Sequence, residues 1–173
     1  MDESLPDIIA PGLLVVFCGI NPGKKSAALG HHFGGGNRFW RVIYLAGFTM
    51  EQILPENAHT ILNYRCGLTT AVGRATVRAD EVSKHEFLAG AKNLEQKIVR
   101  YAPRYIAFLG KAAYSALCGQ REVHWGAQPD SFGGAQVWVL PNPSGLNRGF
   151  SLDDLVHAYR QFRLATEAEN SLE

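Results

Sequence analysis

The stretch LLVVFCGINPG, residues 13–23, joins a continuous apolar run to a sharp polar turn. A short apolar run that lacks alternating polar residues and ends in glycine is typical of a strand buried on both faces of a parallel sheet. The pattern recurs at residues 105–109 and 137–140, which are followed by a glycine and a proline. Residues 67–72 form a weaker fourth candidate. The sequence therefore predicts four strands of a mainly parallel sheet.

Helical patterns lie between and after these runs. Apolar residues recur with helical spacing in four segments, residues 37–46, 83–101, 111–117 and 152–165. Ser83, with Glu86 three residues later, resembles a capping box, which marks a helix start. Strands that alternate with helices predict an α/β fold, a three-layer sandwich in which helices flank a central, mainly parallel, four-stranded sheet. Ligands of such folds bind beyond the carboxyl ends of the strands.

Length and composition predict one globular domain spanning residues 1–173. The chain has 173 residues, of which 46% are hydrophobic, enough for one core. Apolar periodicity fades over the last residues, so we expect a frayed tail at about 166–173. The net charge of +1 excludes a histone-like composition, so a nucleic-acid partner would need positive charge gathered on one face. No stretch approaches the length of a membrane span, and no membrane partner is expected.

The N-terminus and the cysteines indicate a cytoplasmic protein. Residues 1–11 contain three acidic residues and no basic segment followed by a long apolar run, so they do not resemble a secretory signal peptide. Cys18, Cys66 and Cys118 are odd in number and scattered, as expected for reduced thiols rather than a disulfide framework. We therefore expect a cytoplasmic location.

The first polar loop follows the first strand. Residues 19–23, Gly-Ile-Asn-Pro-Gly, form a turn in which main-chain N–H groups can point into a cavity, and Asn21 presents an uncharged carboxamide there. A glycine-rich stretch with two histidines, residues 24–36, comes next. Taken alone, an Asn-Pro-Gly turn is most often a simple strand ending.

The second polar loop follows the last strand. It reads Pro-Asn-Pro-Ser-Gly-Leu-Asn-Arg over residues 141–148 and carries one aliphatic side chain, Leu146, two residues before Arg148. An apolar wedge beside a cation suits a protein that enters a base stack. Because both loops follow parallel strands, the fold would bring them to one edge of the sheet.

Together the two loops resemble the paired motifs of the bacterial mismatch-specific uracil-DNA glycosylases, relatives of eukaryotic thymine-DNA glycosylase. Residues 37–40, Asn-Arg-Phe-Trp, residues 64–67, Tyr-Arg-Cys-Gly, and residues 81–84, Glu-Val-Ser-Lys, are similar to the same family in the same order. The resemblance extends from about residue 9 to about residue 159. It implies a monofunctional, monomeric enzyme that flips uracil, and related altered pyrimidines such as ethenocytosine, out of G-mispaired duplex DNA. The N-glycosidic bond is then hydrolysed and an abasic site is left for base excision repair.

The resemblance also implies roles for individual residues. Asn21 would position the water that attacks the sugar, because a carboxamide can orient water but cannot act as a strong base. The base pocket would be formed by Ile20, Ser26, Phe33 and Asn142, with the Phe33 ring stacked on the base. Gly145, Leu146 and Arg148 would form the wedge that fills the gap in the duplex and contacts the opposite guanine.

The chain departs from the family pattern at two places. Residues 34–36 are all glycine where relatives carry bulkier residues, so we expect a more flexible pocket mouth. Thr70 stands where some relatives have a longer polar or basic side chain. No cofactor is expected, and no metal either, because His31 and His32 lack a third ligand at metal spacing. Candidate phosphate contacts are Lys24, Lys25, Arg38, Arg41, Arg74, Arg78, Lys111 and Arg148.

Two alternatives stay open from the sequence. The chain could be a non-catalytic sensor that binds mismatches or abasic product through Leu146, although the presence of Asn21 argues against this. It could also be a hydrolase of free nucleotides, for which Leu146 would be dispensable.

Overall fold

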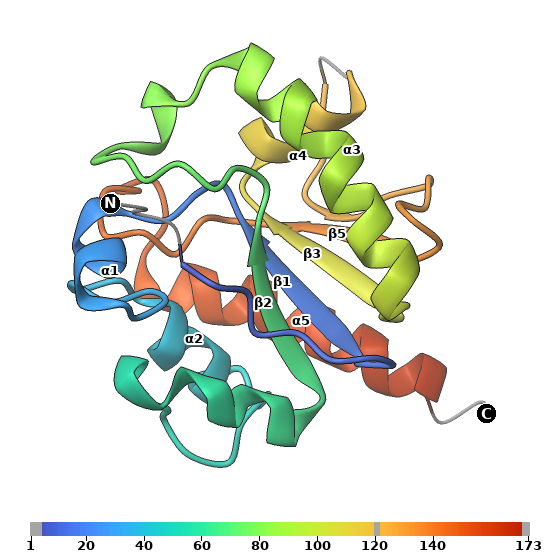
Figure 1. The fold of residues 1–173 in the computed structure, drawn as a ribbon. Helices are drawn as coiled ribbons and strands as arrows, with labels where there is room; N and C mark the ends of the chain where they lie inside the picture. Colours follow the sequence, from blue (N-terminus) through green and yellow to red (C-terminus); the bar gives the residue numbers. More distant parts are fainter. Residues whose placement is uncertain (1–4, 120–121, 171–173) are drawn as a thin grey trace.

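The structure is a computed structural model that describes residues 5–119 and 122–170. Its centre is a sheet, drawn as arrows in Figure 1, that contains five strands. The strands are β1 (Val15–Gly19), β2 (Cys66–Thr70), β3 (Tyr105–Leu109), β4 (Gly126–Ala127) and β5 (Gln136–Leu140). They lie in the order β2-β1-β3-β5-β4, with every pair parallel except β4 and β5. The four predicted parallel strands are confirmed. The predicted count of four was incomplete, because the two-residue strand β4 is too short to leave a hydrophobic pattern.

Helices cover both faces of the sheet, which confirms the α/β sandwich. The helices are α1 (Lys24–Leu29), α2 (Phe39–Leu45), α3 (Lys84–Tyr101), α4 (Lys111–Cys118) and α5 (Leu152–Asn170), with 3-10 turns at Pro55–Tyr64 and Ala79–Glu81. Figure 1 shows α3 and α4 on one side of the sheet and α2 and α5 on the other. Alternate residues of β1 pack into opposite layers, Phe17 against α2 and α5 and Val16 against α3 and α4. The continuous apolar run of β1 therefore contributes side chains to both hydrophobic cores, one on each face of the sheet.

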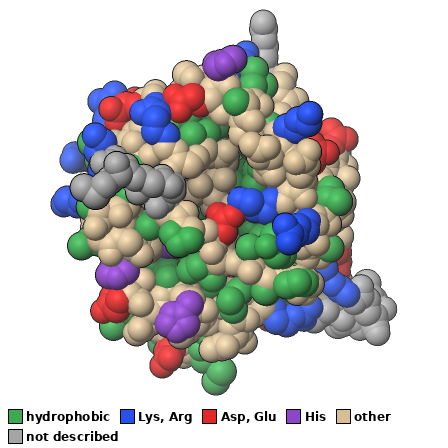
Figure 2. All heavy atoms as spheres, viewed as in Figure 1, with side chains coloured by type: hydrophobic (Ala, Val, Ile, Leu, Met, Phe, Trp, Pro, Cys, Tyr) green, Lys and Arg blue, Asp and Glu red, His purple; other side chains and the backbone are tan. Residues whose placement is uncertain are grey.

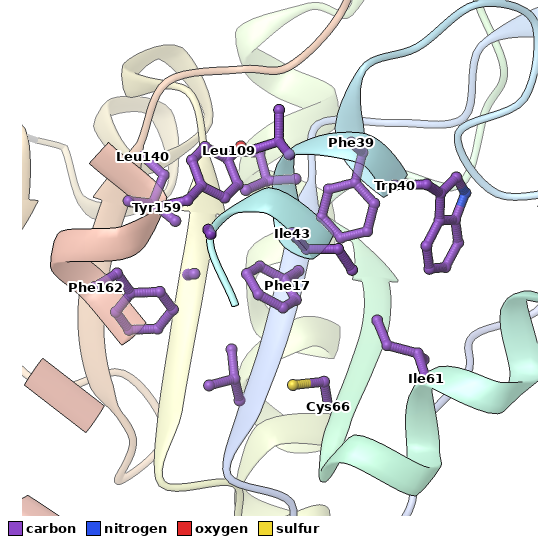
Figure 3. Close-up of a cluster of buried hydrophobic side chains, with 14 of the residues drawn as sticks. Phe17, Phe39, Trp40, Ile43, Ile61, Cys66, Leu109, Leu140, Tyr159 and Phe162 are labelled. Carbon is purple, nitrogen blue, oxygen red and sulfur yellow. The ribbon is translucent and has the colours of Figure 1, made fainter. Parts of the chain in front are cut away.

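An aromatic cluster fixes α2 and α5 against the sheet (Figure 3). The ring of Phe17 makes edge-to-face contacts with Phe39 of α2 at 5.3 Å and Phe162 of α5 at 6.2 Å between centroids. Each such pair contributes about 0.5–1.5 kcal/mol beyond its area burial. Because α2 follows the first polar loop and α5 follows the second, this cluster anchors both loops to the same sheet.

The helix boundaries largely follow the sequence predictions. The capping box of α3 is confirmed, since the Ser83 side chain accepts a hydrogen bond from the Glu86 N–H and the Glu86 side chain reaches back to the N-cap. The expected fraying from residue 166 was wrong for residues 166–170, because α5 continues to Asn170 and Thr166 is buried. Residues 171–173 lie outside the described part of the chain.

The three cysteines are free thiols. Cys18 and Cys66 are buried in β1 and β2, and burial raises the pKa of the Cys66 thiol to about 12, which keeps this thiol protonated near neutral pH. Cys118, at the end of α4, is exposed. Within residues 5–119 and 122–170, no helix combines the length and the apolar character that crossing a membrane requires.

A glycine of α3 permits the close approach of this helix to the end of β2. A Cβ added at Gly90 would collide with the carbonyl oxygen of Ala71. Alanine normally stabilises a helix interior by about 1 kcal/mol over glycine. We expect Gly90→Ala to destabilise the protein instead, by about 1–3 kcal/mol, because the added methyl group overpacks against main chain. Thermal unfolding measures the effect.

Gly73→Ala is the matched control for Gly90→Ala. Gly73 lies near the same strand end, but a Cβ there would meet nothing within 4 Å. The melting temperature of this variant should stay close to that of the wild type. Equal or higher stability of Gly90→Ala would contradict the close packing.

Candidate functional site

A cavity of about 520 Å³ opens beyond the carboxyl ends of the strands. Its floor contains Gly19, Thr70 and Leu109, from the ends of β1, β2 and β3. Residues 20–26 and 32–37 form one wall, and Asn142 and residues 144–146 form the other. The two polar loops therefore meet at one cleft, as the position of both loops after parallel strands predicted.

Gly110 allows the two loops to converge across β3, which separates β1 from β5. Its φ of +122° is one that L side chains rarely adopt. A Cβ at this position would lie 3.7 Å from Ile20 and 3.8 Å from Asn142, so the glycine fills the narrow space between the loops. Sequence reasoning identified Gly110 only as a strand ending.

The loop after β1 is held by the segment after β2. The parallel pairing continues beyond the strands: the N–H groups of Ala71 and Val72 donate to Gly19 and Ile20, at 2.9 and 3.0 Å. Further along, the Thr76 N–H donates to the Pro22 carbonyl at 3.2 Å. The position of the first polar loop therefore depends on residues 71–76, which sequence reasoning did not connect with it.

The carboxamide of Asn21 is held in one orientation. Its Nδ2 donates to the carbonyl oxygen of Arg74 at 2.6 Å and to Thr76 Oγ1 at 2.9 Å. Thr76 Oγ1 in turn donates its proton to the carbonyl of Arg78 at 2.7 Å, so it can only accept from Asn21. Because both N–H groups are used, Asn21 Oδ1 is the atom left to accept a hydrogen bond from a water or ligand in the cavity.

Phe33, which lines the cavity, is stacked on the buried ring of Phe39. The ring of Phe33 lies 4.0 Å from that of Phe39, with 26° between their planes, and Phe33 has a φ of +53°, in the left-handed region. Ser26, buried on α1, accepts a hydrogen bond from the Gly34 N–H at 3.0 Å and so fixes the turn that follows Phe33. Trp40 Nε1 donates to the carbonyl of His32 at 2.9 Å. These contacts stabilise a strained backbone that sets the direction of the Phe33 ring.

The second polar loop is tied together by its own side chains. Asn142 Oδ1 accepts from the Ser144 N–H at 2.9 Å, and the Asn142 carbonyl accepts from Asn147 Nδ2 at 2.9 Å. Leu146 is 67% exposed at the edge of the cavity. Arg148 is exposed, and of the sequence-predicted site residues it is the one outside the cavity lining. Ile20, Asn21, Ser26, Phe33, Asn142, Gly145 and Leu146 all line it.

The basic residues near the cleft differ in their availability to a ligand. Lys24 and Lys25 are exposed on the wall of the cavity. Figure 2 shows Lys and Arg side chains gathered on the side where α1 and the segment after β2 lie. Others have protein partners: Arg74 pairs with Glu86, Arg78 with Asp80, and Lys111 lies over the Trp125 ring. The sequence suggested Arg38 as a phosphate contact, but its guanidinium donates hydrogen bonds to main-chain carbonyls of the protein instead.

Metal-binding side chains do not gather in the described part of the chain. No group of three His, Cys, Asp or Glu residues lies close enough there to hold an ion. His32 Nε2 instead makes a 2.7 Å hydrogen bond with the Pro6 carbonyl, which ties the N-terminal segment to the cavity wall.

The chain matches a known protein family over most of its length. The family described as the uracil DNA glycosylase superfamily matches residues 6–163. The matched region contains both polar loops, the segment after β2 and every cavity-lining residue from Gly19 to Leu146.

An ion pair with Glu86 fixes the side chain of Arg74, the residue whose carbonyl accepts from Asn21, and it makes the stability of the protein pH-dependent. The pKa of Glu86 is lowered from 4.5 to about 2. The largest cause is its hydrogen bonding with the Arg74 side chain, and the second is its hydrogen bond with the Ser83 N–H. A carboxyl whose pKa is lower in the folded than in the unfolded protein stabilises the fold at pH values above its unfolded-state pKa. This stabilisation is lost as pH falls from about 5 to about 2. We expect Glu86→Gln to melt below the wild type at pH 7, and the difference to shrink across this window.

The control for Glu86→Gln is Asp80→Asn, which removes a carboxylate from the more exposed ion pair with Arg78. Its melting temperature should differ little from that of the wild type, since exposed pairs contribute about 0–1 kcal/mol. A Glu86→Gln deficit that is the same at pH 7 and pH 2 would contradict the account of this ion pair.

Proposed function

Because the chain belongs to the uracil DNA glycosylase superfamily, whose members are DNA glycosylases that hydrolyse N-glycosyl bonds, we propose that its substrate is uracil mispaired with guanine in duplex DNA. Related altered pyrimidines such as ethenocytosine are included in the proposal. The product is an abasic site. The observation that carries the proposal is the meeting of the oriented Asn21 carboxamide and the exposed Leu146 at one cavity.

The cavity suits a single flipped pyrimidine. Its volume of about 520 Å³ lies within the range of about 300–1,000 Å³ typical of small-molecule sites. The base stacks on the face of the Phe33 ring opposite Phe39 in this proposal. Base stacking on an aromatic ring contributes about 1–3 kcal/mol. Because the Phe33 ring is already held by its contact with Phe39, stacking on the base does not require the Phe33 side chain to become ordered first.

In the proposed hydrolytic step, the C1′–N1 bond breaks and uracil leaves as an anion, a water held by Asn21 Oδ1 adds to C1′, and the proton that this water releases neutralises the uracil anion. A carboxamide does not take a proton from this water near neutral pH, so it contributes orientation. The activation barrier for breaking the N-glycosidic bond must therefore be lowered by stabilisation of the departing uracil anion. Main-chain N–H groups around Ile20 and Phe33 are the proposed donors, and loss of one such donor costs about 2.7–4 kcal/mol in other enzymes.

Leu146 provides the wedge in this proposal. An aliphatic side chain exposed at the rim of the cavity can occupy the gap that the flipped nucleotide leaves. Arg148, exposed two residues further on, contacts the opposite guanine. Because a G·U mispair costs less to open than a normal pair, the flipping step itself favours mismatched sites.

A duplex with one G·U pair tests the proposed reaction. After incubation with the protein and treatment with alkali, strand breaks are expected at the uracil. Asn21→Ala should abolish most of this cleavage but keep binding to the same duplex, because it removes the water-orienting oxygen and not the wedge. Gel analysis measures cleavage, and fluorescence anisotropy measures binding.

The outcomes separate the proposal from its alternatives. Binding of the G·U duplex by the wild type without alkali-labile breaks would indicate a sensor. Cleavage of free deoxyuridine 5′-monophosphate that is unaffected by Leu146→Ala would indicate a nucleotide hydrolase. A duplex with an ordinary A·T pair at the same position is the control and should stay intact.

Thr76 is expected to support catalysis through Asn21. Thr76→Val keeps the size of this buried side chain but removes the acceptor for Asn21 Nδ2. The variant loses this hydrogen bond and the one from Thr76 Oγ1 to the Arg78 carbonyl. Loss of the bond to Asn21, of about 1–1.5 kcal/mol, corresponds to a rate roughly tenfold lower. Thr76→Ser should restore most of the single-turnover excision rate. Equal rates for the Val variant and the wild type would show that Asn21 needs no such support.

A further inference from the structure

The guanidinium of Arg38 is occupied by the main chain of the second polar loop. Its Nε donates to the Pro143 carbonyl at 3.2 Å and its Nη1 to the Phe150 carbonyl at 2.8 Å. Its Nη2 donates to both the Ser144 and the Asn147 carbonyls, each at 2.9 Å. These four acceptors lie on both sides of Leu146 in the sequence. One side chain therefore gathers the whole loop that carries the wedge.

This contact joins the two walls of the cavity. Arg38 follows Asn37 and the glycines at positions 34–36, which line the wall opposite the loop. The walls come close at the mouth, where a Cβ on Gly145 would lie 3.7 Å from the Gly36 carbonyl. The main-chain N–H of Arg38 adds a further hydrogen bond, to the Pro143 carbonyl at 3.2 Å. The spacing of the walls is therefore set largely by this arginine.

The other hydrogen bonds of the loop do not reach the opposite wall. Asn142, Ser144 and Asn147 bond to one another within the loop. Tyr159 Oη donates to the Pro141 carbonyl at 2.7 Å, which anchors the start of the loop to α5. Among the described residues, Arg38 is thus the side chain that connects the middle of the loop with the Phe33 side of the cleft.

We propose that Arg38 is a positioning residue that holds Leu146 ready to enter the duplex. The inference rests on the proposed function, because it assigns Arg38 to the flipping of the base. Arginine suits this role because its planar fork presents five N–H donors in fixed directions. Lysine offers a single compact charge and cannot hold carbonyls spread over residues 143–150.

A double-mutant cycle on the G·U duplex tests this role. Arg38→Gln should lower kcat/KM at least tenfold, and Arg38→Lys should not restore it. In a Leu146→Ala background, Arg38→Gln should cost less than about threefold, because a residue that acts through the wedge has little effect once the wedge is gone. Tenfold losses in both backgrounds would overturn the proposal.

Two further readouts distinguish positioning of the wedge from a phosphate contact and follow the flipping step directly. Loss of a phosphate contact reduces the slope of log K against log salt by about 1. We expect an unchanged slope for Arg38→Gln, and a reduced slope would overturn the proposal. Fluorescence of 2-aminopurine beside an uncleavable uracil analogue should show less base flipping by this variant than by the wild type. Flipping at the wild-type level would also overturn it.

Arg160→Gln is the matched control. Arg160 also donates to a main-chain carbonyl, that of Leu45 at 2.9 Å, but on α5 and away from the cavity lining. Excision by this variant should match the wild type. Wild-type protein that leaves the G·U duplex intact would refute the proposed function itself, whereas normal excision by Arg38→Gln would refute only the role of Arg38.

Discussion

Both N–H groups of the Asn21 carboxamide are held by the segment after β2, and the remaining chemistry of the cleft depends on this constraint. An amide that could rotate would present an oxygen or a nitrogen to the cavity with similar ease. The acceptors at Arg74 and Thr76 remove that freedom, since one is a carbonyl and the other has already donated its proton. The continued parallel pairing of residues 71–76 with the loop after β1 keeps these acceptors in place.

The motif Asn-Arg-Phe-Trp at residues 37–40 organises the cleft around this constraint. Asn37 Oδ1 accepts from the Phe39 N–H at the start of α2, and Arg38 holds the loop that carries Leu146. Phe39 supports the Phe33 ring, and Trp40 holds the His32 carbonyl. Four consecutive residues thus connect the core, the stacking ring and the second loop. The structure thereby couples the loop proposed to flip the base to the pocket proposed to receive it.

The sequence predicted the frame of the molecule better than its connections. The strands β1, β3 and β5 and the helices α2, α3, α4 and α5 have clear hydrophobic patterns, and β2 has a weaker one. The meeting of the two loops follows from parallel topology. The short elements α1 and β4 were not predicted, because elements of six and two residues show little hydrophobic periodicity. The contacts of Asn21 and Arg38 were missed for a different reason: most of their acceptors are main-chain carbonyls, which every residue has. Only the folded chain shows which carbonyls are within reach.

The orientation of Asn21 toward a flipped base is tested most directly by a crystal structure with bound DNA. A duplex that contains 2′-fluoro-2′-deoxyuridine opposite guanine is suitable, because the fluorine destabilises the oxocarbenium-like transition state and slows cleavage. The account predicts the uracil ring in the cavity against Phe33, Leu146 in the base stack, and a water bound to Asn21 Oδ1. A uracil that stays stacked in the duplex, or an Asn21 with Nδ2 turned to the base, would contradict it.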